Sequence, residues 1–222
     1  MTLTIPFPDR AQAGAALAER LAQEVDWTDA LVLALPRGGV PVAFEVAQRL
    51  RLALDILVVR KLGVPGNREL AMGAIASGGV RVMNEDILQY IQISKAEIDG
   101  TLAQETHELQ RRELAYRGER PWPLIDGRKV ILVDDGLATG ATMRAAVQAV
   151  HQLGAGAVTV AVPVAAPDSI AQLERLADRV VCLHVPHDLY AIGRWYENFD
   201  QTADRQVVAL LQRAWSEGVP PA

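Results

Sequence analysis

Residues 130–142 read V-I-L-V-D-D-G-L-A-T-G-A-T, and this stretch decides the fold class. An unbroken run of four aliphatic residues is typical of a parallel strand that is covered on both faces. Two acids follow at its carboxyl end, which is the edge where open α/β sheets bind ligands. Gly136 and Gly140 allow a tight turn, and a helical pattern begins at Thr142. The stretch therefore predicts an α/β fold with a binding site at the end of this strand.

The turn after the two acids has the composition of a phosphate site. The hydroxyls of Thr139 and Thr142, with the amides of residues 138–142, can surround one phosphate at a helix N-terminus. The nucleotide-triphosphate loop G-x-x-x-x-G-K-[ST] requires a lysine that is missing before Thr142, which excludes that class. Asp134 and Asp135 would repel a lone phosphate, so we expect a ligand that also offers sugar hydroxyls. The structural alternative is a plain D-G turn that ends a strand.

This order of strand, acid pair and T-G-x-T loop resembles the motif with which type I phosphoribosyltransferases bind 5-phosphoribosyl-1-pyrophosphate (PRPP). The resemblance covers residues 130–142 without a gap. It implies that Asp134 and Asp135 bind the ribose hydroxyls, that Asp135 can also act as an acid-base group, and that the loop binds the 5-phosphate. The PRPP-binding residues implied in this way are Asp134, Asp135, Gly136, Leu137, Ala138, Thr139, Gly140, Ala141 and Thr142.

Two other predicted strands end in cations. Residues 30–35 lead into Pro36-Arg37-Gly38-Gly39, and residues 54–59 lead into Arg60-Lys61. Either stretch alone is also compatible with a solvated turn. Together with the acid pair, they would line one crevice at the carboxyl edge of the sheet. In the family that these motifs resemble, such positions hold pyrophosphate, which implies this role for Arg37, Gly38, Gly39, Arg60 and Lys61.

The rest of the chain alternates between strand and helix patterns, which predicts a doubly wound, mainly parallel sheet within a single domain over residues 1–222. A β-hairpin is expected over residues 70–76 and 80–84, around Ser77-Gly78-Gly79. Further strands are expected over 158–164 and 180–185. Helices are expected over 9–25 with Asp9 as N-cap, 40–50, 142–153, 168–177 with Asp168 as N-cap, and 202–215.

Residues 86–120 interrupt this alternation as a helical insertion. A first helix is expected over 86–93, and Ser94-Lys95-Ala96-Glu97 forms a capping box that opens a second helix ending near Arg117. The second helix has a thin apolar stripe, so it either covers the site as a lid or packs on a partner subunit, which would suit a homodimer. The stripe consists of Ile98, Leu102 and Leu109. The cluster at its end, Tyr116, Arg117 and Arg120, is expected to be solvated rather than to reach pyrophosphate.

Residues 184–222 are predicted to form a small C-terminal hood. Its segment 189–199 contains four aromatic residues, although only 5% of the chain is aromatic. These rings either plug the C-terminal helix against the core or stack on a planar base. The resemblance implies that the hood contacts the acceptor, with Tyr190, Trp195 and Tyr196 as candidates. The proline between His184 and His187 argues against a metal site there.

Composition narrows the function further. Half of the 222 residues are hydrophobic, which is ample for the core of one domain. The net charge of −5 and the lack of a basic run argue against a nucleic-acid or membrane-surface binder. Cys182 lies in an apolar run and is expected to be a buried structural thiol. No apolar stretch is long enough to span a bilayer and the start of the chain lacks a basic signal sequence, so we expect a soluble cytoplasmic protein.

These observations predict Mg²⁺-dependent transfer of the phosphoribosyl group of PRPP to a nitrogen acceptor with release of pyrophosphate. A nucleobase is the acceptor expected first. The residues expected to carry the reaction are Asp134, Asp135, Arg37 and Lys61. Mg²⁺ is expected to be held mainly by substrate and water, without a dedicated protein site. Two alternatives stay open: a PRPP-sensing regulator on the same fold that binds RNA or DNA, and a hydrolase that acts on a phosphoribosyl compound.

Overall fold

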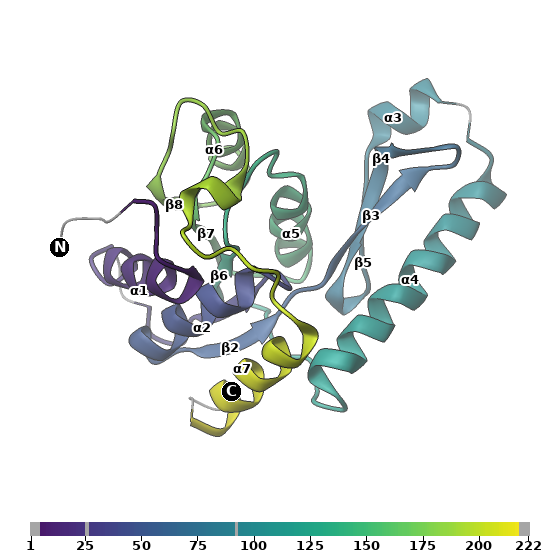
Figure 1. Cartoon of the computed structure of the whole chain (residues 1–222). Helices are drawn as coiled ribbons and strands as arrows, with labels where there is room; N and C mark the ends of the chain where they lie inside the picture. Colours follow the sequence, from purple (N-terminus) through teal and green to yellow (C-terminus); the bar gives the residue numbers. More distant parts are fainter. Residues whose placement is uncertain (1–4, 25–26, 92, 218–222) are drawn as a thin grey trace.

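The structure is a computed structural model that describes residues 5–24, 27–91 and 93–217. Its centre is a five-stranded sheet in which every strand pair is parallel, in the order β2-β1-β6-β7-β8 (Figure 1). The strands are β1 (Leu31–Ala34), β2 (Ala53–Ile56), β6 (Lys129–Val133), β7 (Ala157–Val164) and β8 (Arg179–His184). The chain order reverses between β1 and β6, and such a switch point is where open α/β sheets bind ligands.

Helices cover both faces of this sheet, as the doubly wound prediction requires. Alternate residues of a strand point to opposite faces, so Val32 packs in one hydrophobic cluster and Leu33 in the other. The first cluster includes residues of α1 (Arg10–Leu21), α2 (Gly39–Leu50) and α7 (Asp204–Glu217). The second includes residues of α5 (Ala141–Gln152) and α6 (Pro167–Leu173). The fold prediction is confirmed.

A second, antiparallel sheet stands beside the first and has the order β3-β4-β5. Its strands are β3 (Val59–Val64), β4 (Asn67–Ala76) and β5 (Val80–Met83), and the short helix η1 (Ser77–Gly79) joins the last two. The predicted hairpin is therefore present. The strand expected over 54–59 is corrected, because β2 ends at Ile56 and the chain crosses into β3. The crossing is fixed by Val58, whose N–H donates to Ser77 Oγ and whose carbonyl accepts from the Ser77 N–H, each at 2.9 Å.

The helical insertion consists of α3 (Glu85–Tyr90) and α4 (Lys95–Arg117). Ser94 and Glu97 form the predicted capping box at the start of α4. Leu109 is buried, and Ile98 and Leu102 pack on the hydrophobic cluster that contains β3, β4 and α7 residues. The apolar stripe of α4 is thus covered within the chain, so it gives no argument for a homodimer.

The end of α4 differs from the solvated cluster that was expected. Arg117 is buried and pairs with Asp55 of β2, with Nε 2.8 Å from Oδ1. The guanidinium of Arg120 lies 4.6 Å from the centre of the Trp215 ring of α7. These contacts attach the insertion to the parallel sheet and to the C-terminal helix.

Several helix boundaries also need correction, and among them α3 ends at Tyr90 and α6 at Leu173, before the predicted ends at 93 and 177. Helix α1 has the predicted Asp9 cap but ends at Leu21, and the predicted end at Val25 lies outside the described residues. Asp168 lies in the first turn of α6, whose N-cap is Ala166. No helix among the described residues is long and apolar enough to cross a membrane.

Candidate active site

The acid pair lies where β6 ends, at the switch point of the sheet. The N–H of Asp135 donates to Asp134 Oδ1 at 2.8 Å, and both residues are half-buried. Burial raises the pKa of Asp134 well above its ordinary value, and the charge of Asp135 raises it further. Burial also raises the pKa of Asp135, and the guanidinium of Arg10 opposes that rise. Arg10 Nε lies 2.7 Å from Asp135 Oδ2. Because the charge of Asp135 disfavours the charged form of Asp134, the positive charge of Arg10 beside the pair offsets part of that effect.

The loop between β1 and α2 lies directly on these acids. A Cβ atom added to Gly38 would be 2.0 Å from Asp135 Oδ2, and one added to Gly39 would be 2.7 Å from the carbonyl oxygen of Val133. The Leu35 N–H donates to the same carbonyl at 2.9 Å. Only glycine fits these two positions without displacing the acid pair. The structure therefore brings the predicted sugar-binding and pyrophosphate-binding stretches together.

The predicted phosphate loop turns into α5 through Gly140, which has a positive φ of 65°. Two side chains bind carbonyl groups of this loop. Arg144 Nη1 donates to the carbonyl of Thr139 at 2.7 Å, and Ser169 Oγ donates to that of Ala138 at 2.6 Å. The N–H of Ala141, the first of α5, donates to Thr139 Oγ1 at 3.5 Å, and the other amides of the first turn, which have no partner inside the helix, are suited to an anion.

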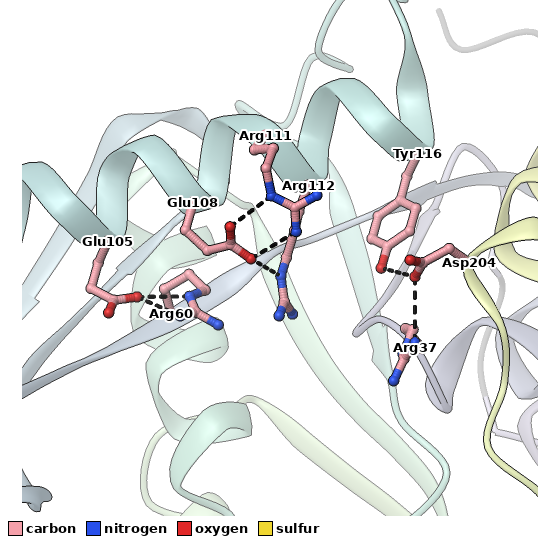
Figure 2. Close-up of polar contacts among 8 residues, drawn as sticks. All are labelled: Arg37, Arg60, Glu105, Glu108, Arg111, Arg112, Tyr116 and Asp204. Carbon is pink, nitrogen blue, oxygen red and sulfur yellow. Dashed lines mark hydrogen bonds and ion pairs between the residues drawn. The ribbon is translucent and has the colours of Figure 1, made fainter.

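Arg37 follows β1 and is connected to two helices. Its Nη1 lies 3.6 Å from Asp204 Oδ1 at the start of α7, and the same oxygen accepts the Tyr116 hydroxyl of α4 at 2.7 Å (Figure 2). Burial and this hydrogen bond raise the pKa of Tyr116 to about 12. Asp204 is mostly exposed, at 66%, so its pairing with Arg37 is open to exchange for a ligand anion.

Arg60 and Lys61 are successive residues of β3, and successive strand residues point to opposite faces. Arg60 points toward α4, where its Nε donates to Glu105 Oε2 at 2.8 Å (Figure 2). Lys61 lines a cavity of about 470 Å³ together with Thr142 and other residues of α5. The prediction placed both cations at the carboxyl edge of the parallel sheet. This is corrected, since both belong to the antiparallel sheet and Lys61 is the one that shares a cavity with the phosphate loop.

The aromatic residues of the hood serve different purposes. Tyr196 is 5% exposed, its ring stacks on Phe199 with centres 4.9 Å apart, and its hydroxyl donates to the Asp135 carbonyl at 2.6 Å. Tyr196 is therefore part of a plug, which is the alternative to stacking on a base. Trp195, in the short helix η2 (Ile192–Trp195), packs against His184 with ring centres 4.5 Å apart. Tyr190 is 80% exposed, and its contact with an acceptor stays a prediction, as does that of Trp195.

Four residues of the site were missed by sequence reasoning: Arg10, Arg144, Ser169 and Asp204. Arg10 lies 125 positions before its partner Asp135 in the sequence. Asp204 lies 167 positions after its partner Arg37. No local pattern marks such pairs. Arg144 carried a weak signal, since it lies one turn into the helix that follows the phosphate loop.

An acid pair, the predicted phosphate loop and a cationic glycine loop thus meet at the switch point of the sheet, an arrangement suited to a phosphorylated sugar. The family model of the phosphoribosyl transferase domain matches residues 7–193, and the chain belongs to this family. It is 49% identical over 208 residues to a protein of Mycobacterium tuberculosis strain H37Rv named "Putative phosphoribosyl transferase Rv0571c". That match covers 94% of this chain and 47% of the relative, so the chain spans about half the length of the curated relatives it matches.

One solved structure is similar to this chain over nearly the whole length of both proteins. The protein TT1426 from Thermus thermophilus has a TM-score of 0.83 and 45% identity, and the match covers 93% of this chain and 98% of that one. A shorter match joins the chain to the bifunctional protein PyrR of Corynebacterium diphtheriae, with 30% identity over 109 residues. It covers 47% of this chain and 57% of that protein.

Proposed function

We propose that the chain transfers the phosphoribosyl group of PRPP to a nitrogen acceptor and releases pyrophosphate. The observation that carries this proposal is the close packing of Gly38 and Gly39 on Asp134 and Asp135. It joins a cationic glycine loop to an acid pair at the start of a phosphate loop. A ligand that satisfies all three must combine a diphosphate, a sugar diol and a second phosphate, which is the composition of PRPP.

The reaction breaks the bond between the anomeric carbon and a pyrophosphate oxygen, so positive charge develops on the sugar and negative charge on the leaving group. Asp134 and Asp135 accept hydrogen bonds from the ribose hydroxyls and stabilise the positive sugar. Arg37 and the amides of Gly38 and Gly39 stabilise the leaving pyrophosphate. Lys61 approaches from β3, on the cavity that it shares with Thr142.

The donor set of the site fits a magnesium ion that is carried by the substrate. Asp134 and Asp135 offer carboxylate oxygens, the ligands that Mg²⁺ prefers. Among residues 5–24, 27–91 and 93–217, no group of three or more His, Cys, Asp or Glu side chains is placed to hold a metal ion. When bound, the ion would neutralise charge on the pyrophosphate.

The acceptor is a nitrogen nucleophile, with a nucleobase as the first class to test. Tyr190 and Trp195 are the hood residues proposed to contact it, whereas Tyr196 acts by holding the backbone of Asp135. The nitrogen lone pair attacks the anomeric carbon as the pyrophosphate oxygen leaves, and the acceptor's proton passes to Asp135 or to solvent.

Calorimetric titration of PRPP in the presence of Mg²⁺ tests the donor assignment. The variant Asp134→Asn/Asp135→Asn keeps the volume of both side chains but loses two charged acceptors, each contributing about 1.5–3 kcal/mol. We expect its affinity for PRPP to fall at least tenfold. The matched control is Asp99→Asn/Asp188→Asn, which makes the same charge change at exposed positions and should bind like wild type. Equal affinity of the acid-pair variant and wild type would contradict the proposal.

A screen of nitrogen acceptors that follows pyrophosphate release then tests the reaction. Release that requires one acceptor supports the transferase, and release without any acceptor identifies the hydrolase. A regulator would bind PRPP without turnover and shift an RNA or DNA probe at low salt.

A further inference from the structure

Arg10, the first residue of α1, lies beneath the acid pair although the predicted motifs do not include it. Its Nε is 2.7 Å from Asp135 Oδ2, and the two side chains are 12% and 15% exposed. The position of Gly38 shows that Oδ2 also abuts the glycine loop. A half-buried ion pair of this kind fixes the orientation of the carboxylate, because each partner would be left uncompensated if the other turned away.

Arg10 is itself held in place from two sides. Its Nη1 donates to the carbonyl of Asp200 at 2.8 Å, and its guanidinium lies 3.9 Å from the centre of the Phe199 ring. Planar guanidinium groups are well suited to such stacking. The Tyr196 hydroxyl holds the carbonyl of Asp135 at 2.6 Å, so the carboxylate and the backbone of this acid have separate supports.

Backbone hydrogen bonds connect the segment before Arg10 to the segment that carries Tyr196 and Phe199. The Phe7 N–H donates to the Trp195 carbonyl at 2.8 Å, and the Glu197 N–H donates to the Phe7 carbonyl at 2.8 Å. This pairing joins the entry to α1 to the hood segment 195–200. Arg10 therefore reaches Asp135 from a small rigid assembly rather than from a free helix end.

We propose that Arg10 is the positioning residue of the acid pair: its ion pair holds Asp135 Oδ2 against the glycine loop and so fixes the orientation of the whole carboxylate. The inference rests on the proposed function, since it concerns how the pair receives the ribose hydroxyls of PRPP. It predicts that Arg10 matters for the sugar and not for the diphosphate, which is bound by the neighbouring loop.

The test compares two ligands on the same variants by calorimetry, PRPP with Mg²⁺ and pyrophosphate with Mg²⁺. Arg10→Gln keeps a hydrogen-bond donor but removes the charge, and we expect at least about tenfold weaker PRPP binding, as for loss of a hydrogen bond to a charged group. Its affinity for pyrophosphate should stay within twofold of wild type. Arg10→Lys restores the charge and should recover most of the PRPP affinity. The control Arg20→Gln lies on the same helix, where Arg20 pairs with Glu24, and should change neither affinity.

If Arg10 had a purely structural role, Arg10→Gln would lower the affinities for PRPP and pyrophosphate equally, and Arg10→Lys would not restore them. Either of these results overturns the inference. Unchanged PRPP binding by Arg10→Gln overturns it as well. If Arg10→Gln does not fold, Phe199→Leu decides. It removes the ring beneath the guanidinium, and because that ring also stacks on Tyr196, the variant Tyr196→Phe is measured beside it. A selective loss of PRPP affinity that is larger in Phe199→Leu than in Tyr196→Phe supports the inference, and an equal loss or unchanged affinity overturns it. If wild type binds pyrophosphate but not PRPP, the proposed function fails, and the inference falls with it.

Discussion

Replacing Arg117 by methionine is expected to destabilise the protein by about 3–5 kcal/mol, because it leaves a buried carboxylate without its partner. Arg117 Nε and Nη2 lie 2.8 and 3.1 Å from the two carboxylate oxygens of Asp55, and the side chains are 7% and 3% exposed. The substitution also removes a hydrogen bond of 2.6 Å to the carbonyl of Pro121 and a contact with the Trp122 ring at 4.8 Å. These additional losses place the expected cost in the upper part of that range.

The cost should depend on pH in a defined direction. Burial raises the pKa of Asp55 above its unfolded value, and Arg117 opposes that rise. A raised folded pKa means that the folded protein binds more protons than the unfolded chain, so the contribution of Asp55 to stability falls as pH rises through the folded pKa. Without Arg117 the pKa rises further. The destabilisation should therefore be largest at neutral pH and smaller in acid, where Asp55 can take up a proton.

Urea unfolding at pH 7 and pH 5 measures both effects as changes in the free energy of unfolding. The matched control is Arg111→Met on the same helix, whose ion pair with Glu108 is solvated, so its loss of stability should be far smaller. The double variant Asp55→Asn/Arg117→Met removes both charges and should regain part of the stability. An Arg117→Met protein within about 1 kcal/mol of wild type at pH 7, or one whose deficit grows on acidification, would refute the reasoning.

Three smaller predictions concern the site and the single thiol. Asp204→Asn should tighten pyrophosphate binding about two- to fivefold in calorimetry, because it frees Arg37 from an exposed ion pair, and weaker binding would contradict this. Lys61→Met should lower PRPP affinity more than Arg60→Met, since Lys61 shares a cavity with the phosphate loop, and the opposite order would show that the two faces of β3 were misassigned. Cys182 is half-buried rather than fully buried as expected, and this partial burial raises its pKa to about 11, so its alkylation at pH 8 should be about 100-fold slower in the folded protein than in urea and should speed up with rising pH. A folded rate within tenfold of the unfolded rate would be inconsistent with that burial.

The central sheet could be predicted because each parallel strand is an apolar run that stands alone in the sequence. The run 54–59 was the exception, since its apolar residues 56–59 continue without a polar break through the point where the chain changes sheets. That point is set by Ser77, which binds Val58 from 19 positions away. Hydrophobic periodicity reports which residues are buried, but not in which of two adjacent sheets they lie.

Charged residues show the same limit more sharply. On a helix with a thin apolar face, Arg117 has the pattern of a solvated residue. Its burial follows from Asp55, a carboxylate inside a strand 62 positions earlier, and the sequence contains no local sign that the two meet. The turn through Gly140 into α5, in contrast, was predictable because its geometry depends on consecutive residues, and its binding of an anion stays a prediction. Sequence reasoning thus succeeded where the local structure depends on neighbouring residues and failed where two distant charges compensate each other.

Compensation of this kind also affects which anions the candidate site would favour on the proposed function. Three arginines around the candidate site each hold a carboxylate in this structure. The pairs are Arg10–Asp135, Arg37–Asp204 and Arg60–Glu105. Because these cations are already partly neutralised, the site attracts anions less strongly than its arginines alone would suggest. On the proposed function, PRPP must then bring part of its own counter-charge, which makes its affinity steeply dependent on Mg²⁺. A lone phosphate or a nucleic-acid backbone lacks the sugar diol that would engage the acid pair. The carboxylates that weaken general anion binding therefore favour a ligand that offers both phosphate groups and a sugar diol.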